Sequence, residues 1–310
     1  MFRGKPHSIT PTHQSVTKEK PPAKPRINPV VIEHTPAEES INDVIAELDS
    51  LIGLDSVKAL IKEIQAFVQI QQKRSLYNLV SEPVVLHMIF KGNPGTGKTT
   101  VARIIGKMFK HMGVLTKGHL LEVERADLVA EYIGQTAQKT RANIKKAMGG
   151  ILFVDEAYSL ARGGEKDFGK EAIDTLVKAM EDHRSDIIVI LAGYSQPMED
   201  FLQTNPGLKS RFPIIIDFPN YSTFELFKIA ENMLEQRQYK LNKEAKAKLY
   251  ILIEKLVAVN EENFGNARVV RNIIEKAVRR QAVRLVSKGQ ITRNDLIEIV
   301  ADDILEVLNE

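Results

Sequence analysis

The chain has 310 residues, of which 43% are hydrophobic and 27% charged, and its formal net charge is +3. These proportions are ordinary for a folded globular protein of about two domains, and so small an excess of positive charge does not favour a nucleic-acid-binding protein. The sequence contains no cysteine, which excludes disulfides and thiolate metal sites and is typical of a reducing compartment. Because no run approaches the ~20 apolar residues of a membrane helix and the first residues lack the apolar core of a signal peptide, we expect no membrane segment and a cytoplasmic protein.

Residues 1–36 differ in composition from the rest of the chain: they are basic and poor in apolar side chains. They contain seven prolines, namely Pro6, Pro11, Pro21, Pro22, Pro25, Pro29 and Pro36. Because proline removes a backbone donor and the segment has little apolar surface to bury, we predict a disordered, proline-rich tail. Such a tail is either a docking arm for an acidic partner or membrane surface, or a solvated extension, and solvated extensions are the more common.

The next segments alternate between helices and strands. Apolar side chains recur at helical spacing in residues 38–50 and 56–78, and residues 84–91 (VVLHMIFK) form an apolar strand that precedes a helix at 99–112. Further strands are predicted at HLLEVE near residue 119, GILFVD near 150, DIIVILAG near 186 and FPIIIDF near 212. Because such alternation is typical of a parallel sheet with helices on both faces, we predict an α/β domain over residues 37–220.

Residues 221–310 show only helical periodicity, and no strand is predicted among them. Helices are expected near residues 223–237, 243–259 and 266–288, followed by a short segment from Thr292 and a terminal helix. This pattern predicts a small all-α domain after the α/β domain.

Residues 92–99 read GNPGTGKT, a complete match to the phosphate-binding pattern G-x-x-x-x-G-K-[ST] between a predicted strand and a predicted helix. Glycines let the backbone wrap closely around phosphates, and the amides and the helix N-terminus attract anions. Lys98 is expected to reach the β- and γ-phosphates of ATP, and Thr99 to bind Mg²⁺. The expected nucleotide contacts are Gly92, Asn93, Pro94, Gly95, Thr96, Gly97, Lys98, Thr99 and Thr100. The flanking strand and helix disfavour the alternative of a chance glycine-rich turn.

The apolar segment ILFV ends in two carboxylates, Asp155 and Glu156. At the end of a strand beside the phosphate loop, Asp155 would hold the Mg²⁺ shell, and Glu156 would orient or deprotonate the attacking water. An acidic strand end is common and says little alone, but together with GNPGTGKT it predicts an enzyme that hydrolyses ATP.

These residues resemble the AAA+ superfamily of ATPases, over about residues 40–300. Within it, the resemblance is to the branch that holds CbbX, a rubisco activase, and stage V sporulation protein K. The segments that carry it are DLVAEYIGQTAQKT at residues 127–140, AMGGILFVDEAYSL at 147–160, ILAGY at 190–194 and NPGLKSRF at 205–212. We favour the sporulation members of the branch over its rubisco activases.

The resemblance implies roles for further residues. Ile52 and Gly53, in the segment LIGL, would contact adenine, and Arg211 would be the arginine finger that reaches the γ-phosphate bound by a neighbouring subunit. Arg268 resembles the arginine called sensor 2, which touches phosphate in the same subunit, although Arg271 lies one turn later and competes for the role.

One position departs from the commoner family pattern. Many relatives carry Asn or Thr as sensor 1 at the end of the fourth strand, where this chain has Tyr194. A phenol can donate a hydrogen bond but reaches further, so a sensor role and a packing role are both open for Tyr194.

Tyr132, Ile133 and Gly134 match the aromatic–hydrophobic–glycine loop that remodelling members of the superfamily point into a central pore. An aromatic ring gives a large contact area against an extended peptide, and glycine permits unusual backbone angles. A second, polar loop at residues 162–167 would line the same pore or lie free on the surface. A finger that acts on a neighbour requires an oligomer, and the resemblance implies a homohexamer.

The sequence thus predicts an ATP-driven ring that remodels a protein client in bacterial spore formation, in the cytoplasm of the mother cell or forespore. The client is not specified by the sequence. A CbbX-like rubisco activase is the first alternative. A DNA-handling ATPase and an ATP-dependent assembly switch are the others. The near-neutral charge and the Tyr-Ile-Gly loop argue against the DNA-handling ATPase. The intact set of Lys98, Asp155, Glu156 and Arg211 argues against the assembly switch.

Overall fold

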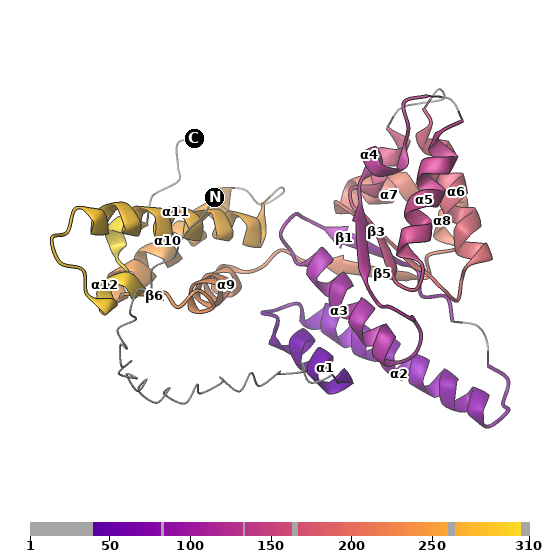
Figure 1. Ribbon diagram of the computed structural model, residues 1–310, viewed down its shortest axis with the longest axis horizontal. Helices are drawn as coiled ribbons and strands as arrows, with labels where there is room; N and C mark the ends of the chain where they lie inside the picture. The colour runs from indigo at the N-terminus through magenta and orange to yellow at the C-terminus, as the bar shows by residue number, and fades with distance from the viewer. Residues whose placement is uncertain (1–39, 82–83, 133, 163–166, 260–263, 305–310) are drawn as a thin grey trace, which may run out of the picture. The chain divides into compact units, whose positions relative to one another are not determined.

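The computed structural model describes residues 40–81, 84–132, 134–162, 167–259 and 264–304, which form a parallel sheet with flanking helices and a C-terminal helical region (Figure 1). The predicted tail at residues 1–36 lies outside the described residues. None of the helices within the described ranges is both long and apolar enough to cross a membrane.

The sheet has five strands in the order β2-β3-β4-β1-β5, and each neighbouring pair is parallel. The strands are β1 (Met88–Gly92), β2 (Leu120–Val123), β3 (Ile151–Val154), β4 (Ile188–Gly193) and β5 (Ile214–Phe218). Because β1 and β3 both pair with β4, the residues that follow them lie at the same edge of the sheet, where ligands of open α/β folds bind. The fold therefore brings the GNPGTGKT loop and Asp155 to one place.

Helices cover both faces of the sheet, as predicted (Figure 1). One face packs against α1 (Ile41–Ser50), α2 (Asp55–Leu76) and α3 (Lys98–His111), and the other against α5 (Thr136–Ala147), α6 (Gly169–Asp182) and α7 (Ser195–Thr204). Successive strand residues point to opposite faces, so Ile89 and Phe90 belong to different cores and both are fully buried. Short elements complete this part of the chain: α4 (Arg125–Leu128), the 3₁₀ helix η1 (Ala157–Ala161) and α8 (Pro206–Lys209).

The first strand is shorter than the predicted residues 84–91 and begins at Met88. Met88 is the first residue paired on both sides, with Ile190 and Ile214. His87 is also buried, and its Nδ1 accepts a hydrogen bond from the backbone N–H of Val189 at 3.1 Å. Leu86 is buried before the strand ladder begins, and for this reason the apolar pattern predicted too early a start.

The C-terminal region contains three long helices close to the predicted positions. They are α9 (Thr223–Glu235), α10 (Lys243–Val259) and α11 (Asn266–Val286). The capping box at Ser222, whose hydroxyl accepts from the backbone N–H of Glu225 while the Glu225 carboxylate accepts from the Ser222 N–H, fixes the start of α9.

The prediction that this region has no strand was wrong. Two short strands, β6 (Lys240–Leu241) and β7 (Glu298–Ile299), pair in parallel, so that Leu241 lies beside Ile299. A two-residue strand has no detectable alternation, which is why the pattern missed it. The short segment expected from Thr292 is the helix α12 (Arg293–Ile297), followed by β7 and a 3₁₀ turn, η3 (Ala301–Asp303), and residues 305–310, where the expected terminal helix would end, lie outside the described residues.

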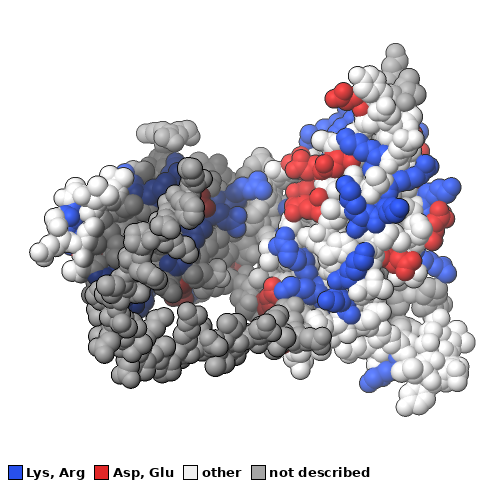
Figure 2. Space-filling model, in the orientation of Figure 1, with Lys and Arg blue, Asp and Glu red and all other residues white. Residues whose placement is uncertain are grey.

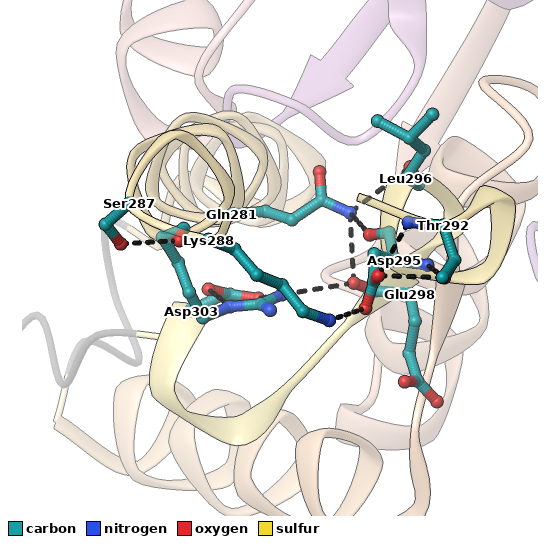
Figure 3. Close-up of polar contacts among 9 residues, drawn as sticks. Gln281, Ser287, Lys288, Thr292, Asp295, Leu296, Glu298 and Asp303 are labelled. Carbon is teal, nitrogen blue, oxygen red and sulfur yellow. Dashed lines mark hydrogen bonds and ion pairs between the residues drawn. The ribbon is translucent and has the colours of Figure 1, made fainter. Parts of the chain in front are cut away.

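A single buried side chain explains this irregular end. Gln281 of α11 is 3% exposed, and its Nε2 lies 3.0 Å from the backbone oxygen of Asp295, 3.2 Å from that of Leu296 and 3.0 Å from that of Glu298 (Figure 3). Lys288 pairs with the Asp295 carboxylate at 2.6 Å and, with the hydrogen bonds from Thr292, holds the pKa of that carboxyl well below its usual range. The bonds from Gln281 satisfy backbone carbonyls that a continued helix would satisfy with its own N–H groups.

Candidate nucleotide-binding site

The phosphate loop connects β1 directly to α3, which begins at Lys98. Gly95 has a φ of +72°, and a Cβ there would lie 2.3 Å from the Gly265 oxygen and 2.8 Å from the Arg268 nitrogen. The Gly95 oxygen also accepts a hydrogen bond from the Ala267 N–H at 3.2 Å. Glycine is therefore required at position 95, both by the backbone angle and by the close approach of the start of α11.

Lys98 is held inside the loop by two carbonyls of the same loop. Its Nζ donates to the oxygens of Gly92 at 2.8 Å and Asn93 at 2.9 Å. Burial lowers the pKa of the Lys98 ammonium to about 8, with Asp155 opposing the shift and Arg268 adding to it. The side chain is thus a desolvated cation beside a second cation, an arrangement that a polyanion would stabilise.

Asp155 and Glu156 follow β3 at the same edge of the sheet. The Asp155 carboxylate accepts a hydrogen bond from the Glu156 N–H at 3.0 Å. Glu156 is exposed and has a φ of +46°, a left-handed conformation that costs a non-glycine residue roughly 1–3 kcal/mol and that occurs preferentially at functional sites. The Tyr158 hydroxyl contacts the Glu156 carboxylate, and its pKa is raised to about 12 by burial and by the charge of Glu156.

Thr99 lies on the first turn of α3, and its hydroxyl donates to the Glu122 carboxylate of β2 at 3.4 Å. Thr99 and Asp155 line one cavity. Over the described residues no cluster of three or more His, Cys, Asp or Glu side chains could hold a metal by itself. This donor set fits Mg²⁺, which is usually held by one or two protein oxygens, by phosphates and by water.

The cavity at this edge has a volume of about 780 Å³, within the usual range of ligand sites, ~300–1,000 Å³. Of the predicted site residues, those that line it are Ile52, Gly92, Pro94, Gly95, Gly97, Lys98, Thr99, Thr100, Asp155, Glu156, Tyr194 and Arg268. Arg271, the competitor for the sensor-2 role, lines it as well. The pocket thus contains both arginines.

Three predicted contacts do not line the cavity. Asn93 and Thr96 stabilise the loop instead, since the Thr96 hydroxyl donates to the Asn93 oxygen at 2.7 Å and the Asn93 amide to Asn220 at 3.0 Å. Gly53 lies beside Glu225 and Tyr221, whereas Leu51, Ile52 and Leu54 face the cavity. Tyr194 lines it near Tyr158, with the two ring centroids 6.1 Å apart.

Sequence reasoning missed the residues that join the C-terminal region to the phosphate loop. Asn266 is completely buried with a φ of +46°; its amide nitrogen lies 2.7 Å from the Phe264 oxygen and 3.3 Å from the Pro94 oxygen, and its oxygen accepts from the Tyr221 N–H at 3.0 Å. The residues of α9 that line the cavity, among them Ile229 and Met233, were also missed. The segment GNAR, in which Asn266 is the first residue of α11, was the available signal, because asparagine is among the few non-glycine residues that adopt a positive φ.

Arg211 lies outside this cavity, next to a different one. Its guanidinium pairs with the Glu181 carboxylate at the end of α6, with Nε at 2.9 Å, and donates to the Gly207 oxygen at 2.7 Å. The structure therefore does not bring Arg211 to the nucleotide cavity of its own chain.

Tyr132 lies between α4 and α5 and is 67% exposed. Gly134 has a φ of +80° in open surroundings, whereas Ile133 and most of the polar loop at residues 162–167 lie outside the described residues. Tyr132 is thus available for contact with another molecule.

Comparisons with known proteins agree with this architecture. A family model described as "ATPase family associated with various cellular activities (AAA)" matches residues 88–220, and one described as "AAA lid domain" matches residues 222–310. "Stage V sporulation protein K" of Bacillus subtilis is 56% identical over 266 residues, which are 85% of this chain and 82% of that protein. "Protein CbbX" of Cereibacter sphaeroides is 46% identical over 268 residues, 84% of this chain and 85% of that one.

Among solved structures, the Thermotoga maritima RuvB Holliday junction branch migration motor superposes with a TM-score of 0.52 at 20% identity, over 83% of this chain and 68% of that one. At that identity the likeness concerns the fold alone. The two sequence relatives each match over more than four-fifths of both chains. The chain therefore belongs to the AAA+ family of ATPases, in the branch that contains stage V sporulation protein K and CbbX.

Proposed function

We propose that the chain is an ATP-hydrolysing motor that assembles into a ring, a homohexamer, and remodels a protein client. The observation that carries the proposal is the convergence of Lys98, Asp155, Glu156 and Arg268 on one cavity. Membership of an ATPase family supports nucleotide binding, and the residues of the cavity support hydrolysis. Arg211 and Tyr132, which lie outside the cavity, support action on a neighbouring subunit and on a client.

Lys98 and Arg268 would bind the phosphates of ATP together with the amides of the loop and of the N-terminal turn of α3. Thr99 and Asp155 would hold Mg²⁺, which, when bound, neutralises negative charge on the phosphates. The apolar side chains of Ile52 and Leu54, which line the cavity together with Met233 of α9, would pack against the adenine. Burial destabilises the charged form of Lys98, and a bound phosphate would stabilise that charged form again.

Glu156 would orient or deprotonate the water that attacks the γ-phosphate. Its left-handed backbone turns the chain sharply after β3 and leaves the carboxylate exposed at the cavity. Asp155, one residue earlier, accepts the Glu156 N–H and so helps to fix that turn. Two adjacent carboxylates would thus serve different purposes, one for the metal and one for the water.

Arg211 would complete the site of a neighbouring subunit. Its position away from its own cavity supports action on a neighbour, which a head-to-tail ring provides. Tyr132, exposed between α4 and α5, would contact the client, and Tyr194 would serve either as sensor 1 or in packing.

We also propose the domain organisation of the chain: a tail at residues 1–36, an α/β nucleotide-binding domain at 37–220 and a helical lid at 221–310. Similarity to stage V sporulation protein K supports a role in bacterial spore formation, in the mother cell or forespore. A CbbX-like function, with rubisco as the client, is the second candidate, supported by the 46% identity to CbbX.

The test is light scattering of the Glu156→Gln protein with and without ATP–Mg²⁺. We expect nucleotide to produce a particle of about six times the 34.8 kDa chain, because ATP would bind without turnover. The matched control, Lys98→Ala, should stay small under both conditions. A Glu156→Gln protein that binds ATP and remains monomeric would contradict the ring, and undiminished phosphate release would contradict the role of Glu156.

A further inference from the structure

Arg125 lies where three segments of the α/β part meet. It is the first residue of α4, and its guanidinium donates to the Ser159 backbone oxygen at 2.7 Å. The same guanidinium makes a two-point ion pair with the Asp167 carboxylate, at 3.0 and 2.5 Å. Asp167 is 9% exposed at its side chain and Arg125 32%, so the pair is largely shielded from water.

The junction is closed by the start of α6. The Gly169 N–H donates to the Asp167 carboxylate at 3.1 Å, and a Cβ on Gly169 would lie 1.9 Å from the Leu160 oxygen and 3.0 Å from Arg125 Nη1. Only glycine fits this contact, so α4, η1 and α6 are locked together around one guanidinium.

On one side, hydrogen bonds connect this junction to the backbone of Glu156, the residue proposed for catalysis. The Ser159 N–H donates to the Glu156 oxygen at 2.7 Å, and the Ser159 oxygen is the acceptor for Arg125. Two successive hydrogen bonds therefore link the strained Glu156 backbone to the Arg125 side chain. A change in the turn at Glu156 would move the Ser159 carbonyl and, with it, the guanidinium.

On the other side, the segment from Arg125 to Ala130 is fixed to α5. The Thr140 hydroxyl donates to the Leu128 oxygen at 3.0 Å, and the Thr136 hydroxyl accepts from the Ala130 N–H at 3.0 Å. Both threonines are completely buried. The segment from Arg125 to Ala130 ends two residues before Tyr132, which is exposed. Because packed interiors are rigid, a displacement of Arg125 would also displace the residues next to Tyr132.

We infer that Arg125 and Asp167 are positioning residues that couple the nucleotide site at Glu156 to the exposed loop at Tyr132. The inference rests on the proposed function, since it requires that nucleotide bind beside Glu156. An arginine is needed because its planar fork bonds a carboxylate at two points and a carbonyl at the same time, which a lysine ammonium cannot reproduce.

The absence of tryptophan from the chain allows a direct test. Tyr132→Trp places a single tryptophan on the loop, and its fluorescence is recorded with and without the non-hydrolysable analogue AMP-PNP and Mg²⁺. Calorimetry gives the nucleotide affinity of the same samples. We expect a fluorescence change in the parent, and a change reduced by at least half when Arg125→Lys or Asp167→Asn is added, with the affinity altered less than about threefold, or 0.7 kcal/mol.

Arg284→Lys is the matched control. Arg284 near the end of α11 also makes a two-point pair with a buried aspartate, Asp303, at 3.0 and 2.9 Å, with side-chain exposures of 33% and 2%. Loss of this pair should lower thermal stability about as much as Arg125→Lys does, yet leave the Tyr132→Trp signal intact. A merely structural role for Arg125 predicts the same intact signal in both variants.

The outcomes separate this inference from the proposed function. An undiminished signal in both junction variants, or a parent that binds nucleotide without any signal, would overturn the coupling while the nucleotide site stands. A parent that binds no nucleotide by calorimetry would overturn the proposed function and the coupling with it.

Discussion

The hydroxyl of Tyr221, two residues before α9, donates a hydrogen bond to the backbone oxygen of Thr96 at 3.1 Å, which joins the C-terminal region to the centre of the phosphate loop. The ring is 8% exposed, and burial raises the pKa of the Tyr221 hydroxyl to about 12, so the group remains a neutral donor at any physiological pH. The phosphate loop is therefore supported from the C-terminal side as well as by its own strand and helix.

Tyr221→Phe removes only this hydrogen bond and keeps the ring. We expect a loss of about 1 kcal/mol in the free energy of unfolding, because the buried Thr96 oxygen loses its partner. Urea denaturation measures that loss, and calorimetry should show ATP affinity reduced a few-fold. Unchanged stability and affinity would indicate that Thr96 needs no support from Tyr221.

The affinity for ATP should depend on pH through Lys98. Its pKa in the free protein is about 8, and bound phosphate favours the protonated form, so binding is strongest below pH 8 and weakens as the pH rises through that value. From about pH 7 to pH 9 the affinity should fall about tenfold. Calorimetry across this range measures the fall, and a flat profile would contradict the lowered pKa.

Arg268→Ala provides the matched control for that titration. Arg268 contributes to the low pKa of Lys98, so its removal should shift the fall in affinity to higher pH, in addition to weakening binding. A fall at unchanged pH would mean that the Arg268 charge does not reach Lys98.

Asn266 should be one of the most sensitive residues for folding. It combines complete burial, a φ of +46° and hydrogen bonds to two other segments, at Pro94 and at residues 220–221. Asn266→Gly keeps the backbone angle and should cost about 2–3 kcal/mol through unpaired buried groups, and Asn266→Ala should cost about 1 kcal/mol more because of the angle. Equal denaturation midpoints for the two variants would contradict the strain.

The phosphate loop and the Asp155–Glu156 pair could be predicted because their chemistry is local: a contiguous pattern follows an apolar strand, and both strands end at the same edge of a parallel sheet. Asn266 and Tyr221 could not, since their partners in the phosphate loop lie more than a hundred residues away and a lone Asn or Tyr has no periodic signal. The strands β6 and β7 were missed because two residues cannot show alternation, and Gln281, which holds that segment, lies on a helix whose pattern is otherwise ordinary.

Arg211 offers the sharpest test of the ring. The Arg211→Ala protein should bind ATP but lose at least about 10³-fold in turnover, because the charge that would stabilise the transition state is missing at the neighbour's site. Mixed with Lys98→Ala subunits, it should regain turnover, since some interfaces then combine an intact Lys98 with an intact Arg211 from the next subunit. A mixture of Lys98→Ala with Glu156→Gln is the control: both residues serve the same subunit's site, so no arrangement of subunits restores it. Phosphate release measures both mixtures, and recovery in neither would leave Arg211 with only the role seen in the single chain, its pairing with Glu181.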